Sequence, residues 1–169
     1  PYAAAFATAG IGYAFHRRNV RLRDAALAKI APRAAFLDAS LAELDAGDRV
    51  HFIAGDVKQR ESCEAIVDGT VDHFGRIDIL VANAGISVGM DTAVFADLEV
   101  MRATYETNNL GLAATFHPFV APMLARKSGT LVGIASVAGI RGLPGHGAYS
   151  SSKAGVIAYC ESLRGECRA

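Results

Sequence analysis

Short apolar runs alternate with longer amphipathic stretches along the whole chain. The apolar runs predict β-strands at residues 2–5, 25–31, 49–55, 76–85 and 129–136. The amphipathic stretches repeat apolar residues at helical spacing and predict helices at residues 13–18, 34–44, 61–74, 98–126 and 149–164. Within the fourth of these helices, Pro118 and Pro122 predict an irregular or kinked second half.

This strand–helix alternation, with almost wholly apolar strands, predicts a doubly wound parallel sheet. The expected fold is therefore Rossmann-like α/β, with helices on both faces in three layers (α/β/α). In such a sheet, ligands bind at the carboxyl ends of the strands. Residues 83–85 and Ser136 each end a predicted strand and should lie at the same edge. Because no linker or repeat interrupts the chain, residues 1–169 are expected to form one domain.

Charge and cysteine content narrow the class of protein. Lys+Arg and Asp+Glu are equal at 17, which gives no indication of a nucleic acid or an anionic membrane surface as partner. No apolar run is long enough to span a membrane, and the apolar N-terminus lacks the basic region of a signal peptide. The three cysteines lack metal-ligand spacing, so we expect no metal site and free thiols in a reducing, cytoplasmic compartment.

Tyr149 and Lys153 are four residues apart at the start of a predicted helix, so their side chains share one face. An ammonium group about 4 Å from a phenolate, at an effective dielectric near 20, stabilises it by roughly 4 kcal/mol. That would bring the pKa of a phenol from about 10 towards neutrality, as general acid–base catalysis requires. Ser136 could hold a carbonyl or hydroxyl oxygen beside that phenol. The chemistry indicated is proton transfer to or from a C–O group.

Tyr-x-x-x-Lys alone is a common spacing on surface helices, and a lone serine after a strand is usually a turn residue. The combination of segments carries more information. They are DV (56–57), VANAG (81–85), ETNNLG (106–111), GIASVAG (133–139) and AYSSSKAGV (148–156). In this order and at these intervals they resemble the motifs of the short-chain dehydrogenase/reductase family, most strongly from about residue 49 onward.

The resemblance implies four catalytic residues, Asn108, Ser136, Tyr149 and Lys153. Tyr149 would be the general acid–base, Lys153 would lower its pKa and bind the nicotinamide ribose, and Ser136 would orient the substrate oxygen. Asn108 would hold a water that links Lys153 to solvent. Asn109 is the competing choice, although Asn108 has the family's Asn-x-x-Gly spacing.

The resemblance also implies a nicotinamide cofactor, which would supply the hydride. Its binding residues would be Gly10, Ile11, Gly12, Arg33, Asp56, Val57, Asn83, Ala84, Gly85, Tyr149 and Lys153. For Asn83, a structural role between neighbouring strands is an equally good interpretation. The end of the second predicted strand carries Arg33 and no acidic residue, which modestly favours NADP(H) over NAD(H).

Two departures from the family pattern bear on activity. The glycine motif reads AFATAGIG (5–12), with Phe6 at the position of the family's first glycine. A phenylalanine there is expected to disturb a tight turn and to fill pyrophosphate space. Family members also continue past the Tyr-Lys helix into two more strands and a substrate-binding segment, so the chain is expected to be truncated at its C-terminus.

The expected function is NADP(H)- or NAD(H)-dependent interconversion of a small-molecule secondary alcohol and a ketone. The alternative is a truncated, inactive family member that folds partly or serves only as an interaction partner. The four catalytic residues favour the enzyme, whereas Phe6 and the absent strands favour the alternative. The family resemblance further implies a homodimer or tetramer. His146, in a Gly-rich run, is interpreted as a solvated loop residue rather than a catalytic one.

Overall fold

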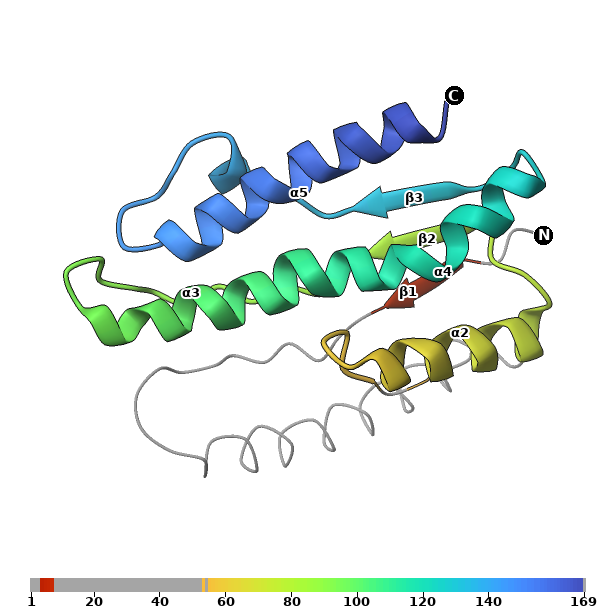
Figure 1. Cartoon of the computed structure of the whole chain (residues 1–169), viewed down its shortest axis with the longest axis horizontal. Helices are drawn as coiled ribbons and strands as arrows, with labels where there is room; N and C mark the ends of the chain where they lie inside the picture. Colours follow the sequence, from red (N-terminus) through yellow and green to blue (C-terminus); the bar gives the residue numbers. More distant parts are fainter. Residues whose placement is uncertain (1–3, 8–52, 54, 169) are drawn as a thin grey trace, which may run out of the picture.

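The structure, a computed structural model, describes residues 4–7, 53 and 55–168, with the backbone alone for residues 4–7 (Figure 1). The strands are β1 (Ala4–Ala7), β2 (Ile79–Ala82) and β3 (Thr130–Gly133). The helices are α2 (Arg60–Phe74), α3 (Leu98–Tyr105), α4 (Gly111–Ala125) and α5 (Gly147–Glu166). A π-helical turn covers Glu106–Leu110, and 3₁₀ turns cover Phe95–Asp97 and Val137–Gly139. The elements predicted at 13–18, 25–31 and 34–44, and most of 49–55, lie outside the described residues.

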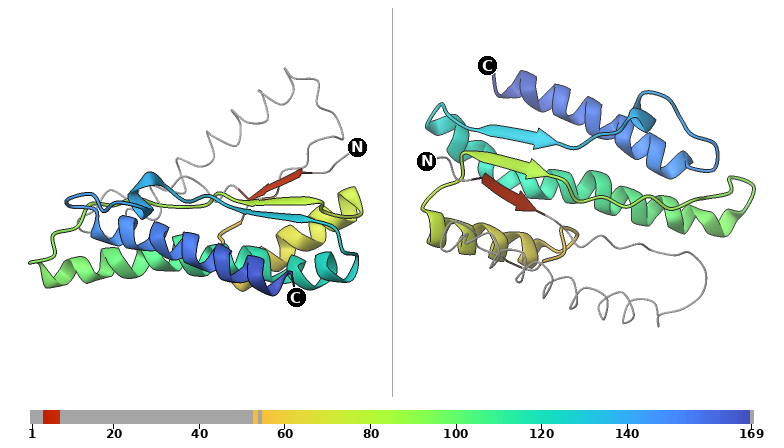
Figure 2. Two further views of the ribbon diagram at one scale, coloured as in Figure 1. Left: turned by 90° about the horizontal axis from the view of Figure 1, so that it is seen from above. Right: turned by 180° about the vertical axis from the view of Figure 1, so that it is seen from behind.

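The three strands form a parallel sheet in the order β1-β2-β3. The labelled helices lie on one face of this sheet (Figure 2). The prediction of an α/β fold with a parallel sheet is thus confirmed.

The core lies between the sheet and helices α4 and α5. On β2, Leu80 and Ala82 are buried, while the alternate residues are half-buried. Burying one such aliphatic side chain contributes about 1.5–3 kcal/mol. The buried apolar cluster comprises Ile77, Leu80, Ala82, Leu112, Phe116, Phe119, Met123, Val156 and Leu163.

Phe6 lies inside β1, where its backbone pairs with Val81 of β2. The sequence motif places the family's first glycine at this position, in a turn that leaves the strand. An extended residue needs no glycine, so the expectation that Phe6 disturbs a tight turn is wrong. The expectation about its side chain concerns a group that the structure does not describe.

The irregular part of the long helical region precedes its two prolines. Helix α4 runs without interruption through Pro118 and Pro122, whereas the π turn lies at Glu106–Leu110. The two prolines therefore do not interrupt the helix, and a kink at them stays a prediction. Each proline removes one backbone hydrogen bond, and burial of Phe116 and Phe119 against the sheet offsets that loss.

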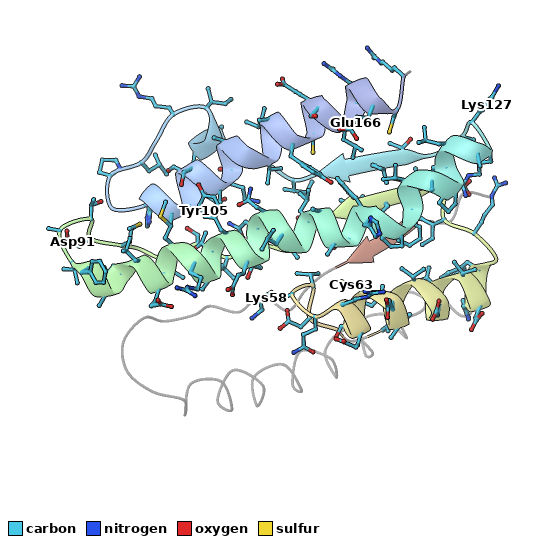
Figure 3. All side chains as sticks on the ribbon, viewed as in Figure 1. Lys58, Cys63, Asp91, Tyr105, Lys127 and Glu166 are labelled. Atoms are coloured by element: carbon cyan, nitrogen blue, oxygen red, sulfur yellow. The ribbon has the colours of Figure 1, made fainter. Side chains whose placement is uncertain are left out.

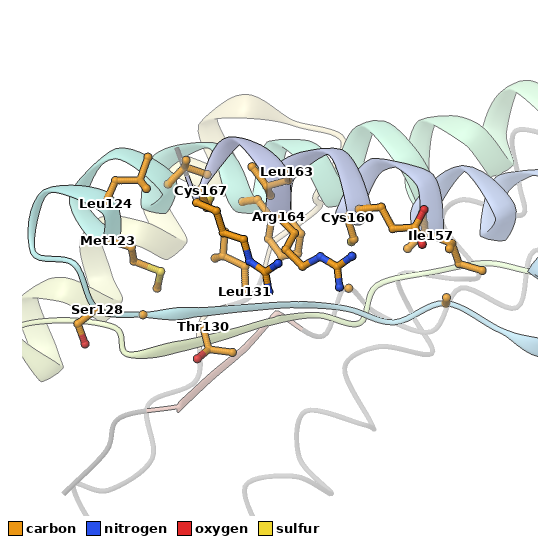
Figure 4. Close-up of a pocket in the computed structure, with 18 of the residues that line it drawn as sticks. Met123, Leu124, Ser128, Thr130, Leu131, Ile157, Cys160, Leu163, Arg164 and Cys167 are labelled. Carbon is orange, nitrogen blue, oxygen red and sulfur yellow. The ribbon is translucent and has the colours of Figure 1, made fainter.

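A pocket of about 970 Å³ lies between β3, the end of α4 and α5 (Figure 4). Met123, Leu131 and Leu163 are among its lining residues, and none of the candidate catalytic residues is. Cys160 also lines it, and burial raises the pKa of this thiol. The three cysteines are free, as predicted, and the half-buried Cys160 packs against the cluster. None of the helices in the described part of the chain combines the length and apolar character needed to cross a membrane.

Candidate active site

The candidate residues gather at the carboxyl ends of β2 and β3. Asn83, Ala84 and Gly85 follow β2 directly, and Ser136 lies shortly after β3. Because β2 and β3 are adjacent and parallel, both segments lie at one edge of the sheet (Figure 1). The position expected for these two motifs is therefore confirmed.

Lys153 reaches from α5 into this edge. The residue is only 5% exposed, and its Nζ donates a hydrogen bond to the carbonyl oxygen of Ile134, at 2.6 Å. Desolvation by this burial lowers the pKa of Lys153 below its usual value of 10.5. Its Nζ lies 5.8 Å from the centroid of the Tyr149 ring. The helix thus presents the ammonium group and the half-buried phenol together.

Gly85 lies where three of the sequence motifs meet: its own segment 81–85, the segment 106–111 with Asn108, and the segment 148–156 with Lys153. A Cβ at this position would lie 3.3 Å from Oδ1 of Asn108 and 3.4 Å from Nζ of Lys153. The first contact is tighter than usual for a Cβ and the second is an ordinary van der Waals contact, so a side chain here would lie against both polar groups. The glycine keeps the turn exposed and leaves the Lys153 ammonium at its border.

Asn108 is 1% exposed and ties the π turn to the loop after β2. Its Oδ1 accepts from Ile86 N at 2.8 Å, and its Nδ2 donates to Ile86 O at 3.0 Å. The same Nδ2 donates to Ser152 Oγ at 2.9 Å. Both amide hydrogens therefore have partners, while Oδ1 and the main-chain carbonyl remain the acceptors that could face a water.

Asn109 is less well satisfied. Its Nδ2 donates to Ser152 O at 2.9 Å, and its Oδ1 is buried with no hydrogen-bond partner among the described residues. Both asparagines therefore contact Ser152 from the same π turn, but their other contacts differ. Asn108 faces the motif at residues 83–86, whereas Asn109 lies against Gly155 of α5.

Ser136 begins the 3₁₀ turn Val137–Gly139. Its Oγ accepts from Ala138 N at 3.2 Å, so the hydroxyl hydrogen remains available to another acceptor. Gly139 packs the turn onto α5, since a Cβ there would lie 2.7 Å from the backbone carbon of Lys153. The turn that follows Ser136 and the helix that carries Tyr149 and Lys153 are thereby packed backbone against backbone.

Asp56 and Val57 lie just before α2. Asp56 Oδ1 accepts from Lys58 N at 3.0 Å, which closes a local turn. Val57 is buried against α4, and a Cβ on Gly111 would lie 2.6 Å from its Cγ2. Close packing against Val57 thus explains why the Asn-x-x-Gly motif has a glycine at position 111. The cofactor candidates Gly10, Ile11, Gly12 and Arg33 lie outside the described residues.

His146 is half-buried at the start of α5. Its Nδ1 is buried and has no hydrogen-bond partner among the described residues. The loop around it is fixed to the loop after β2, because Met90 N donates to Gly145 O at 2.8 Å and Met90 Sδ accepts from Ala148 N at 3.2 Å. The interpretation of His146 as a fully solvated loop residue is therefore wrong.

Sequence reasoning missed two residues of this site. Ser152 is fully buried and links Asn108 to the backbone of Tyr149, since its Oγ donates to Tyr149 O at 2.8 Å. Gly139 allows the close approach to Lys153. The sequence did contain signals for both: Ser152 is a small polar residue directly before Lys153, and Gly139 lies three residues after Ser136.

Asn108→Ala is expected to lower the free energy of unfolding by roughly 2–4 kcal/mol, because Ile86 N, Ile86 O and Ser152 Oγ lose a buried partner. Asn109→Ala is the matched control and should cost only about 1 kcal/mol, since it also removes an unpaired oxygen. Urea unfolding of the two variants measures the difference. Equal losses would contradict the distinct roles of the asparagines.

The sequence is similar to a family model and to several known proteins. The sequence model of short chain dehydrogenases matches residues 6–169. An uncharacterized oxidoreductase of Myxococcus xanthus is 39% identical over 73% of this chain and 48% of the relative. A 3-oxoacyl-[acyl-carrier-protein] reductase of Synechocystis is 36% identical over 76% of this chain and 52% of that protein. The chain thus spans about half the length of the curated relatives it matches.

Solved structures agree with the fold. ElxO with NADP bound superimposes with a TM-score of 0.67 at 29% identity, covering 72% of this chain and 49% of ElxO. Serine dehydrogenase from Escherichia coli gives 0.65 at 32% identity, covering 71% of this chain and 56% of that one. Since the family model matches nearly the whole sequence, the chain belongs to the short chain dehydrogenase family.

Proposed function

We propose that this chain carries the catalytic groups of an oxidoreductase that interconverts a secondary alcohol and a ketone with NADP(H) or NAD(H). The observation that carries the proposal is the convergence of Lys153, Gly85 and Tyr149 at the ends of β2 and β3. Bound there, the nicotinamide would supply or accept the hydride.

The protein's own groups would handle the proton and the orientation. Ser136 donates its hydroxyl hydrogen to the substrate oxygen, and Tyr149 exchanges a proton with that oxygen. The Lys153 ammonium would donate to the ribose hydroxyls of a bound cofactor. Among the described residues, Ile134 O is the acceptor recorded for this ammonium, which leaves two of its three hydrogens as donors for these roles. Asn108 holds a water between Lys153 and solvent.

The alternative proposal is a family member that binds no substrate productively and has no turnover.

The proposed cofactor is NADP(H). The ElxO structures contain NADP or NADPH, which supports a phosphorylated cofactor, as Arg33 does in the sequence. A cytoplasmic location and a homodimer or tetramer are further parts of the proposal. A monomeric mass in light scattering at micromolar concentration would contradict the oligomer.

Cofactor binding is the first test. Titration of the folded chain with NADPH is expected to give enhanced, saturable nicotinamide fluorescence, with weaker binding of NADH. Tighter NADH binding would contradict the cofactor preference. No binding of either, in a sample with helix and strand by circular dichroism, would favour the inactive alternative.

A further inference from the structure

Tyr149 lies in the first turn of α5, the part of a helix that depends most on contacts outside the helix. The first amides of a helix have no carbonyl partner in a preceding turn. Lys153 lies one turn further on, where it is buried and where its Nζ is held by the carbonyl oxygen of Ile134. The placement of the phenol beside this ammonium group therefore depends on what holds the start of the helix.

The residue before α5 does not provide the usual cap. His146 is the N-cap residue, and its side chain makes no capping hydrogen bond. In most helices the side chain at this position accepts a hydrogen bond from an amide of the first turn. Here the amide of Ala148 donates to Sδ of Met90 instead, at 3.2 Å. Among the described residues, this is the one hydrogen bond recorded for the amides of residues 147–149, so the cap comes from a segment 58 residues away in the chain.

Met90 is itself held in place by its backbone. Its amide donates to the carbonyl oxygen of Gly145 at 2.8 Å, so the residue contacts the chain around the start of α5 twice. The amide of the next residue, Asp91, donates to the carboxylate of the buried Asp97 at 2.7 Å. Figure 3 shows Asp91 at the end of the molecule where α5 begins. The loop after β2 therefore presents the sulfur from a fixed backbone.

The two loops also approach each other closely around this sulfur. A Cβ on Gly147 would lie 3.6 Å from the Met90 sulfur, and a Cβ on Gly89 would lie 3.6 Å from Gly145 O. An unbranched methionine side chain adapts to such a site, and its thioether sulfur accepts a hydrogen bond. A leucine would have a similar volume but no acceptor. The identity of residue 90 therefore matters for the hydrogen bond as well as for packing.

We propose that Met90 is a positioning residue for the proton transfer, because its sulfur caps α5 and thereby holds Tyr149 beside Lys153. This inference rests on the proposed function, since it takes the Tyr149 phenol to exchange a proton with the substrate. Without the cap, the first turn of α5 opens more often, and the phenol is correctly placed for a smaller fraction of the time. Lys153 stays in place, because Ile134 O holds its ammonium one turn further on. The loss therefore falls on kcat and leaves cofactor binding nearly unchanged.

Reduction of a panel of ketones with NADPH by the variants Met90→Leu, Met90→Gln and Met101→Leu tests this role. Met90→Leu removes the acceptor and is expected to lower kcat by up to about tenfold, the equivalent of one hydrogen bond. The KM of the ketone and the Kd of NADPH should stay within about twofold of the wild type. Met90→Gln supplies an amide oxygen as acceptor and should restore kcat. Met101→Leu makes the same substitution at a half-buried methionine of α3 and should keep the wild-type kcat.

Amide hydrogen exchange followed by NMR tests the hydrogen bond without any turnover. The amide of Ala148 is expected to exchange up to about tenfold faster in Met90→Leu than in the wild type. Met101→Leu should leave this exchange rate unchanged. Unchanged exchange at Ala148 in Met90→Leu would overturn the proposal, whatever the activity of the variant.

The kinetic outcomes separate positioning from packing. Faster exchange with a wild-type kcat would overturn the proposal, and so would a loss of kcat that Met90→Gln does not restore or that a rise in KM accompanies. If the wild type reduces no ketone although it binds NADPH, the proposed function fails by itself. The nuclear Overhauser effect between the Tyr149 ring and the Lys153 side chain then decides. A weaker effect in Met90→Leu that Met90→Gln restores supports the proposal, and an equal effect in all variants overturns it.

Discussion

Tyr149→Phe is expected to lower kcat by about 10²–10⁴-fold, while leaving the fold intact and NADPH binding detectable. The substitution removes only the hydroxyl group and keeps the ring. The hydrogen bond from Ser152 Oγ goes to the backbone oxygen of Tyr149, so it survives the change. Turnover with a methyl ketone, together with the nicotinamide fluorescence titration, measures both parts of this expectation.

Tyr159→Phe is the matched control, because Tyr159 lies on the same helix and is 40% exposed. Burial of its ring raises the pKa of Tyr159, which makes it a poor proton-transfer group at neutral pH. The control is expected to retain wild-type kcat. Full activity in the Tyr149 variant would exclude this phenol as the proton donor.

Gly139→Ala is expected to cost about 1–3 kcal/mol in the free energy of unfolding and to remove activity. The new methyl group would lie 2.7 Å from the backbone carbon of Lys153 and 2.8 Å from Ala154 N. These are atoms of a helix backbone and cannot turn aside as a side chain can. The turn that carries Ser136 must therefore move away from α5, which separates the serine from Tyr149.

Gly142→Ala provides the comparison. No atom lies within 4 Å of a Cβ at Gly142, and its φ is not positive. Its cost should stay within about 0.5 kcal/mol, as for an ordinary surface change. Urea unfolding and ketone reduction of the two variants separate the close contact from the general effect of an added methyl group. Similar stabilities would show that the turn does not dock as described.

Local signals predicted the local elements well. Helix α2 begins one residue before the predicted start and ends at the predicted residue, because Gly75 with φ 78° closes it. Strands β2 and β3 are shorter than their predicted apolar runs of 76–85 and 129–136. The parallel-sheet rule placed residues 83–85 and Ser136 at one edge without any contact information.

Features that depend on tertiary contacts were not predictable. The π turn exists where Asn108 reaches Ile86, 22 residues away in the chain, and no periodicity reports such a bond. The prolines were the visible local signal in this region, and they gave no indication of the π turn that precedes them. Phe6 was assigned to a turn by motif alignment, whereas the sheet register with Val81 decides its conformation.

The π turn also has a consequence for how this sequence can change length over evolution. A π turn contains one residue more than a turn of α-helix, and this extra residue sets how α4 is rotated about its axis relative to α3. Deleting a residue between Glu106 and Leu110 would turn α4 by about 100° about its axis. Phe116 and Phe119 would then leave the sheet while Asn108 lost Ile86. Insertions and deletions in descendants of this chain should therefore avoid the turn and collect in exposed loops such as residues 141–145.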